Sequence, residues 1–245
     1  MAAIETIDGY VLHRRPWRES SLLIDCFSRT HGRIGLVARG GRSDRSPWRG
    51  LVEPFMPLSI RFIQKGEMGT VRDIEALGDR VMLNGETLMC GLYANELLLS
   101  LIDRQEAVPE LFDHYEALIS RLALVDTRMA VLRRFEWQLL TALGVAPSLT
   151  HDAQGGQVIE QGKRYRLEPE AGFVEDFVEN KRMVDGQAIV WLAGLMRSSP
   201  EHDSIAGGMA GTDTLKQARW ITRTLIDHQL GGRTLKTREM MRALR

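Results

Sequence analysis

Short apolar runs separated by turn residues fill the first third of the chain, and pieces of them, such as residues 61–64, alternate polar with apolar positions. The runs are rich in Val, Ile, Leu and Phe, and glycines such as Gly32 and Gly66 stand between them. Residues of these types at alternating spacing predict β-strands. The predicted strands are residues 10–13, 22–27, 34–38, 58–63 and 70–76. Five short strands in so few residues predict a small closed or nearly closed barrel.

From about residue 84 the apolar positions recur every three or four residues, which is the period of an amphipathic helix. Asn84 is suited to cap a long apolar helix, and Pro109 is suited to the first turn of a second helix. Asp126 is suited to cap a third helix, which Gly144 ends. Three helices joined by short links predict a helical domain that is distinct from the barrel.

The helical period is lost between residues 148 and 182, where glycines and Pro169 separate brief apolar runs at 157–159, 164–167 and 172–174. This pattern predicts a small hairpin insert. Helical spacing then returns over residues 186–197 and 213–230, and a last short helix is predicted from Leu235.

These elements predict an α+β protein of two domains. The first is an N-terminal five-stranded barrel of the OB-fold type over residues 1–79. The second is a mainly α-helical domain over residues 80–245, with residues 148–182 as its insert.

Charge is unevenly distributed along a chain whose formal net charge is zero, with 32 Lys and Arg against 32 Asp and Glu. Between Arg29 and Arg49 there are six arginines, and Asp44 is the only acid. Arginine pairs bidentately with phosphate and stacks on bases, so a cluster beside Trp48 indicates a nucleic-acid surface. A solvated Arg-rich loop is the alternative interpretation, with Trp17 and Trp48 only covering one end of the barrel.

The hypothesis of a polynucleotide surface assigns the phosphate contacts to arginines and the base stacking to Trp48. The candidate DNA-binding residues are Arg33, Arg39, Arg42, Arg45, Arg49 and Trp48, with Arg61 and Arg72 as weaker candidates.

A second basic face is predicted between Lys216 and Arg245, where eight cations stand against Asp227 and Glu239. It could extend the nucleic-acid track, hold an acidic partner peptide between helices, or be a solvated helix face. The candidate residues for a partner peptide are Arg219, Arg223, Arg233 and Lys236.

The sequence gives no signature of catalysis, cofactor or metal. The glycines of residues 207–211 lack the GK[ST] that a phosphate-binding loop needs, and the histidines are scattered without an HExxH pairing. Cys26 and Cys90 form no CxxC motif and are expected to be reduced, buried thiols. We find no signal peptide, and the longest apolar stretch is too short to span a bilayer. A cytoplasmic, non-enzymatic protein is expected.

Three long segments resemble the bacterial RecO family of recombination mediators. They are residues 9–43 (GYVLHRRPWRESSLLIDCFSRTHGRIGLVARGGRS), residues 51–62 (LVEPFMPLSIRF) and residues 228–244 (HQLGGRTLKTREMMRAL). The resemblance implies an N-terminal OB-fold and a helical domain with a zinc-ribbon-like element. It also implies a protein that binds single- and double-stranded DNA and anneals complementary strands. The implied protein partners are the acidic C-terminal tail of single-strand-binding protein and RecR, with which the family loads RecA.

The chain departs from the family pattern in its insert. Many members hold zinc there with four cysteines, whereas residues 148–182 contain none and His151 cannot replace them. The insert is therefore either held by the packing of Tyr165, Leu167, Phe173 and Phe177, or loose. Two other functions stay open: an adaptor that captures an acidic peptide and has a mainly structural barrel, and an RNA-binding OB protein.

Overall fold

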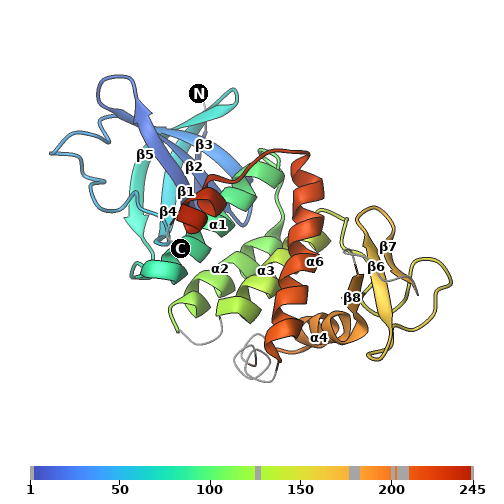
Figure 1. Cartoon of the computed structure of the whole chain (residues 1–245). Coiled ribbons are helices and arrows are strands. Elements are labelled where there is room, and N and C mark those ends of the chain that lie inside the picture. The colour runs from blue at the N-terminus through green and yellow to red at the C-terminus, as the bar shows by residue number, and fades with distance from the viewer. Residues whose placement is uncertain (1–2, 125–127, 177–182, 200–201, 203–209, 244–245) are drawn as a thin grey trace. The chain divides into compact units, whose positions relative to one another are not determined.

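The computed structural model describes residues 3–124, 128–176, 183–199, 202 and 210–243 (Figure 1). The chain forms two compact units. Unit 1 consists of Met1–Ala123 with Leu235–Arg245, and unit 2 of Leu124–Thr234. The barrel therefore shares a compact unit with the helices that follow it and with the C-terminal segment. The domain division after residue 79 stays a prediction.

The five predicted strands form a closed barrel, which confirms the predicted fold class. The order around the barrel is β1-β2-β3-β5-β4, and β3 and β5 are the one parallel pair. The strands are β1 (Ile4–Trp17), β2 (Ser21–Ser28), β3 (Gly32–Ala38), β4 (Pro57–Lys65) and β5 (Met68–Ala76). This is the topology of the OB-fold.

The β2 strand is buried on both faces, which explains why its sequence SLLIDCFS reads as a nearly continuous apolar run. Ile24 belongs to the core inside the barrel. Phe27 faces outward instead, and its ring centroid lies 5.7 Å from that of Phe112 and 6.0 Å from that of Tyr115. The wall of the barrel thus supports a second apolar layer against a helix.

Three helices complete unit 1: α1 (Gly85–Leu101), α2 (Pro109–Leu122) and α7 (Lys236–Ala243). Asn84 is the N-cap residue of α1, as predicted, and its backbone N–H donates to the Thr87 hydroxyl at 3.1 Å. The carboxylate of Glu96 on α1 accepts hydrogen bonds from the backbone N–H groups of Lys236 and Thr237, at 2.8 and 2.9 Å. These bonds satisfy donors at the start of α7 and fix that helix to α1.

A buried polar contact explains the one amide in the apolar α1. The β1 strand has a bulge between Val11 and His13, and the amide of Asn95 donates a hydrogen bond to the carbonyl oxygen of Leu12 there, at 3.0 Å. The Tyr115 hydroxyl in turn donates to the Asn95 side-chain oxygen at 2.7 Å. The bulge would otherwise leave a buried carbonyl without a donor.

In the described residues of unit 2, three helices pack beside a small sheet, whose strand order is β7-β6-β8. The predicted third helix is present, and its predicted cap, Asp126, lies outside the described residues. The elements are α3 (Arg128–Ala142), β6 (Arg164–Glu168), β7 (Gly172–Glu175), β8 (Met183–Asp185), α4 (Gly186–Arg197) and α6 (Thr212–Leu230).

The hairpin of the insert is formed by β6 and β7, whereas the predicted run 157–159 forms only an isolated bridge between Val158 and His151. Tyr165, Leu167 and Phe173 are buried, and Phe177 lies outside the described residues. Packing therefore holds the described part of the insert. This agrees with the first of the two interpretations, in which the insert is packed rather than loose.

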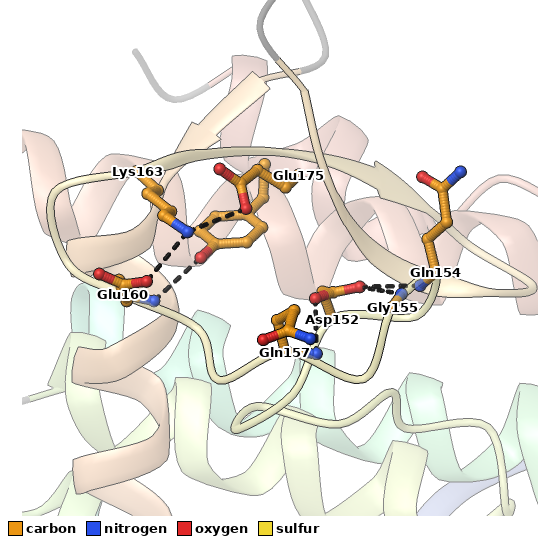
Figure 2. Close-up of polar contacts among 8 residues, drawn as sticks. Asp152, Gln154, Gly155, Gln157, Glu160, Lys163 and Glu175 are labelled. Atoms are coloured by element: carbon orange, nitrogen blue, oxygen red, sulfur yellow. Dashed lines mark hydrogen bonds and ion pairs between the residues drawn. The ribbon is translucent and has the colours of Figure 1, made fainter.

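Hydrogen bonds around one carboxylate organise the loop that precedes this hairpin (Figure 2). The Asp152 carboxylate accepts bonds from the backbone N–H groups of Gln154, Gly155 and Gln157, at 2.9, 2.6 and 2.8 Å. These bonds lower the pKa of Asp152, the bond from Gly155 most of all. The ammonium group of Lys163 bridges the carboxylates of Glu160 and Glu175, which raises the pKa of Lys163. Main-chain and ionic bonds thus close a loop that is free of cysteine.

We predict that this loop opens in acid and when Asp152 is replaced. A lowered pKa means that the ionised carboxylate stabilises the fold above the ordinary Asp pKa of about 3.9, and that this contribution is lost as the pH falls through the lower folded-state value. The backbone amide signals of Gln154, Gly155 and Gln157 should titrate together, with a midpoint below about 3.9. Asp152→Asn should abolish this titration and speed proteolysis of the loop at neutral pH.

The matched control is Gln154→Ala, which removes a side chain but keeps the N–H donor. It should leave both the titration and the proteolysis rate unchanged. A common midpoint at or above the ordinary Asp value, or a protease-sensitive Gln154→Ala variant, would contradict this account of the loop.

Candidate nucleic-acid interface

The far half of β1 forms an exposed two-stranded arm with β2. The pairing of β1 with β4 ends where Tyr10 meets Pro57, whereas its pairing with β2 continues to Trp17 opposite Ser21. Every side chain from residue 13 to residue 20 is exposed. We call residues 14–20 the hairpin tip. The tip has no partner strand on its outer side, and its side chains are open to solvent.

The basic loop 39–56 is fastened to this hairpin tip. The backbone N–H of Arg42 donates to the carbonyl oxygen of Ser20 at 2.9 Å. The Arg42 guanidinium donates to the carbonyls of Arg18 and Glu19, at 3.4 and 3.2 Å. Figure 1 shows the hairpin and the loop, in two shades of blue, extending from the barrel on the same side of the view. Two segments that are separated in sequence therefore form one basic surface.

Several of the candidate arginines are engaged by the protein itself. Arg33 extends from β3 to the C-terminal end of α1, where it donates to the carbonyl oxygens of Leu99 and Ile102. Burial is the main cause of a lowered pKa for Arg33, and the nearby Arg104 adds to it. Since α1 has no basic residue in its own last turn, Arg33 supplies the cation that this helix end favours.

Arg49 and Arg61 are paired with carboxylates. Arg49 contacts Asp44 at 3.0 Å, within the same loop. Arg61 on β4 pairs with Asp73 on β5, and the hydrogen bond between them raises the pKa of Arg61 and lowers that of Asp73. Both arginine side chains remain more than half exposed, but a neighbouring carboxylate neutralises the charge of each.

Arg39, Arg45 and Arg72 are the candidates whose guanidinium groups have no hydrogen bond or ion pair to any residue that the structure describes. Arg39 and Arg45 lie in the basic loop. Arg72 is the extra residue of the β5 bulge, opposite the step from Arg61 to Phe62, and β5 adjoins neither β1 nor β2. The structure thus bonds Arg42 to the hairpin tip, with Arg39 and Arg45 in the same loop, and leaves Arg61 and Arg72 on other strands of the wall.

The hairpin tip adds residues that the sequence analysis did not assign. Arg15 and Arg18 are exposed, and in the described part of the chain their guanidinium groups have no polar partner. Arg14 is also at the tip, but it pairs with Glu53 at 2.6 Å. The run RRPWR of residues 14–18 could have indicated these residues from the sequence, because it places three arginines next to one tryptophan.

The two tryptophans near this surface differ in their surroundings. Trp48 is partly buried and packs against the barrel core together with Leu51 and Met56, which is the covering role that the sequence left open for it. Trp17 is 40% exposed and makes no ring contact with the described residues. Base contact by Trp48 stays a prediction, and Trp17 has the more accessible ring.

The four candidates for a partner peptide do not all lie in one compact unit. Arg219 and Arg223 are one turn apart on α6, and Arg223 pairs with Asp227 at 3.4 Å. The Arg233 guanidinium donates to the carbonyl of Leu230. Lys236 is the first residue of α7 and belongs to unit 1. The role of all four residues in binding a peptide stays a prediction.

The described ranges hold no group of three or more His, Cys, Asp or Glu side chains that could bind a metal ion. None of the helices in the described parts has the length and hydropathy that crossing a membrane requires.

A closed five-stranded barrel with this strand order and a basic outer surface places unit 1 in the class of OB-fold proteins. Sequence models of one family cover nearly the whole chain: "Recombination protein O N terminal" matches residues 1–80 and "Recombination protein O C terminal" matches residues 82–239. The DNA repair proteins RecO of Escherichia coli strains K12 and O157:H7 are each 38% identical to the chain over 235 residues, which cover 96% of this chain and 92% of the relative. The chain therefore belongs to the recombination protein O (RecO) family.

We predict that Arg33 and Arg39 contribute differently to stability. Arg33→Ala should lower the free energy of unfolding by about 1 to 2 kcal/mol, because it leaves carbonyls at the end of α1 without a donor. Arg39→Ala should change it by less than about 0.5 kcal/mol. Urea denaturation of the full chain, followed by circular dichroism, measures both. Equal effects of the two substitutions would contradict the division between structural and unengaged arginines.

Proposed function

We propose that this protein is a DNA-binding recombination mediator that acts in DNA repair in the bacterial cytoplasm. It binds single- and double-stranded DNA, anneals complementary strands, and helps RecR to load RecA on DNA covered by single-strand-binding protein. It carries out these steps without catalysis. Membership of the RecO family supports the proposal, as does the charge distribution of unit 1.

One observation carries the DNA-binding part of the proposal. Arg15, Arg18, Arg39 and Arg45 are exposed, have no polar partner among the described residues, and stand on two segments that Arg42 fastens together. Guanidinium groups that no carboxylate neutralises attract a polyanion, even on a chain without net charge.

Strand annealing follows from the same charges. Two complementary strands repel each other through their phosphates, and cations that pair with both backbones lower this repulsion. Contacts to phosphates do not depend on sequence, so the surface accepts any pair of complementary strands. Base pairing then supplies the free energy of the product, and no nucleotide hydrolysis is needed.

The second part of the proposal is capture of the acidic C-terminal tail of single-strand-binding protein by unit 2. Arg219 and Arg223 on α6 are the cations that we assign to it, with Arg233 at the end of that helix. Lys236 belongs to unit 1 and is a weaker assignment. Affinity for a short acidic peptide, compared with affinity for an oligonucleotide, separates this role from DNA binding. Competition between matched DNA and RNA strands tests the alternative of an RNA-binding protein.

We predict that the unengaged arginines set the salt dependence of DNA binding. Each phosphate contact contributes about 0.7 to the slope of log K against log salt for a single strand. The triple variant Arg15→Gln, Arg39→Gln, Arg45→Gln should therefore reduce the slope by about 2 in magnitude. Fluorescence anisotropy with a labelled oligothymidine, over a series of salt concentrations, measures this slope.

A variant with the same change in net charge provides the control. Arg128→Gln, Arg164→Gln and Arg197→Gln remove three exposed cations of unit 2 that lie outside both predicted basic faces. This variant should keep the slope of the unmodified protein. If it lowers the slope as much as the barrel variant does, overall charge rather than the hairpin tip and loop 39–56 governs binding, and the assignment of the interface is wrong.

A further inference from the structure

We propose that the hairpin tip discriminates single-stranded from double-stranded DNA, with Trp17 as a plane on which an unpaired base stacks and Arg18 as the cation beside it. This inference rests on the proposed function and assigns a separate task to one part of the same surface.

The environment of Trp17 is the first observation that supports it. Among the described residues Trp17 is the one aromatic side chain in the group of large exposed hydrophobic residues. Tyr10, Phe27, Phe112 and Tyr115 of the same unit are all buried and pack against one another. An exposed aromatic ring among cations fits a ligand that carries both π-faces and negative charge, which describes an unpaired nucleotide.

Arginines alone cannot discriminate between the two forms of DNA, because phosphates are present on both. A base inside a duplex is stacked on both of its faces and offers no free plane to a side chain. An unpaired base does offer one, and stacking on an aromatic side chain contributes about tenfold to affinity. On this surface a preference for single strands therefore depends on Trp17 rather than on the phosphate contacts.

The hairpin tip is held in place before any DNA binds. Trp17 is the last residue of β1 and pairs with Ser21 of β2. The carbonyls of Arg18, Glu19 and Ser20 all accept hydrogen bonds from Arg42, so each residue of the turn is tied to loop 39–56. A turn whose backbone is already ordered loses less conformational entropy on binding.

The backbone of Arg18 is the second observation. Its φ angle is +51°, in the left-handed region. Glycine adopts this backbone conformation without steric cost, whereas a residue with a Cβ atom is strained there. Strained residues cluster at functional sites, so the strain at this exposed turn indicates a functional role for the Arg18 side chain.

The side chain of Arg18 is unengaged. Arg18 follows Trp17 in the sequence, and its guanidinium has no polar partner among the described residues. The acidic residue of the turn, Glu19, forms no ion pair with it. Arg18 is therefore available to the phosphate next to a stacked base.

The test uses the full-length chain and the variants Trp17→Ala, Trp17→Phe and Trp48→Ala. The ligands are a labelled oligothymidine and, as a competitor without ends, a relaxed closed-circular duplex. Trp17→Ala should weaken binding of the oligothymidine about tenfold and leave duplex binding within about twofold. Trp17→Phe should restore most of the single-strand affinity, because it keeps an aromatic plane. Circular dichroism during heating should show that the two Trp17 variants melt like the unmodified protein, whereas Trp48→Ala should melt earlier.

The outcomes separate this inference from the proposed function. Unchanged oligothymidine affinity of Trp17→Ala, or equal weakening of both ligands, overturns the role of Trp17 while DNA binding through the arginines stands. If the unmodified protein binds neither ligand, the proposed function itself fails.

A variant of Arg18 tests the second part of the inference. Arg18→Gly relieves the left-handed strain, so the protein should melt at the same or a higher temperature, yet its affinity for oligothymidine should fall several-fold. Retention of full affinity by this variant would overturn the assignment of Arg18.

Discussion

The fastening of loop 39–56 to the β1–β2 hairpin by Arg42 is the contact on which the rest of the account depends. A backbone hydrogen bond to Ser20 and two guanidinium bonds to the neighbouring carbonyls place the loop beside the turn. Without them, a long loop and an outer strand arm would each present cations independently. With them, the two segments that carry the unengaged arginines and the exposed Trp17 are bonded to each other. Charge density therefore comes from tertiary structure, on a chain whose net charge is zero.

Arginine has two separate uses in unit 1. Some arginines hold the fold together: Arg33 satisfies the end of α1, and Arg104 pairs with Asp25 on β2. Others have no partner among the described residues and remain available to a polyanion. Arg33 and Arg61 lie on barrel strands, and Arg14, Arg42 and Arg49 are engaged at the hairpin tip and in loop 39–56. Most of the candidate arginines without a polar partner also lie on these two segments. This division makes a local cationic surface compatible with a balanced composition.

The amino-acid pattern predicted most of the fold and only part of the candidate site. Barrel strands were predictable because short runs rich in Val, Ile, Leu and Phe stand between turn residues, and α1 was predictable from Asn84 and a long apolar run. The outer arm of β1 was missed, because residues 13–17 are all exposed and show no alternation. The contacts of Arg33 were unpredictable, since its partners are main-chain carbonyls of a helix far along the chain. For the same reason the sequence favoured Trp48, and only tertiary packing shows that Trp17 has the more exposed ring.

Photo-crosslinking tests the central claim most directly. The full-length protein would be irradiated in complex with a single-stranded oligonucleotide that carries a photoreactive thymine analogue, and the crosslinked peptides would be identified by mass spectrometry. The account predicts crosslinks concentrated in residues 14–20 and 39–49, with Trp17 as the principal site. Crosslinks confined to residues 128–234, with none on the hairpin tip or the loop, would contradict it.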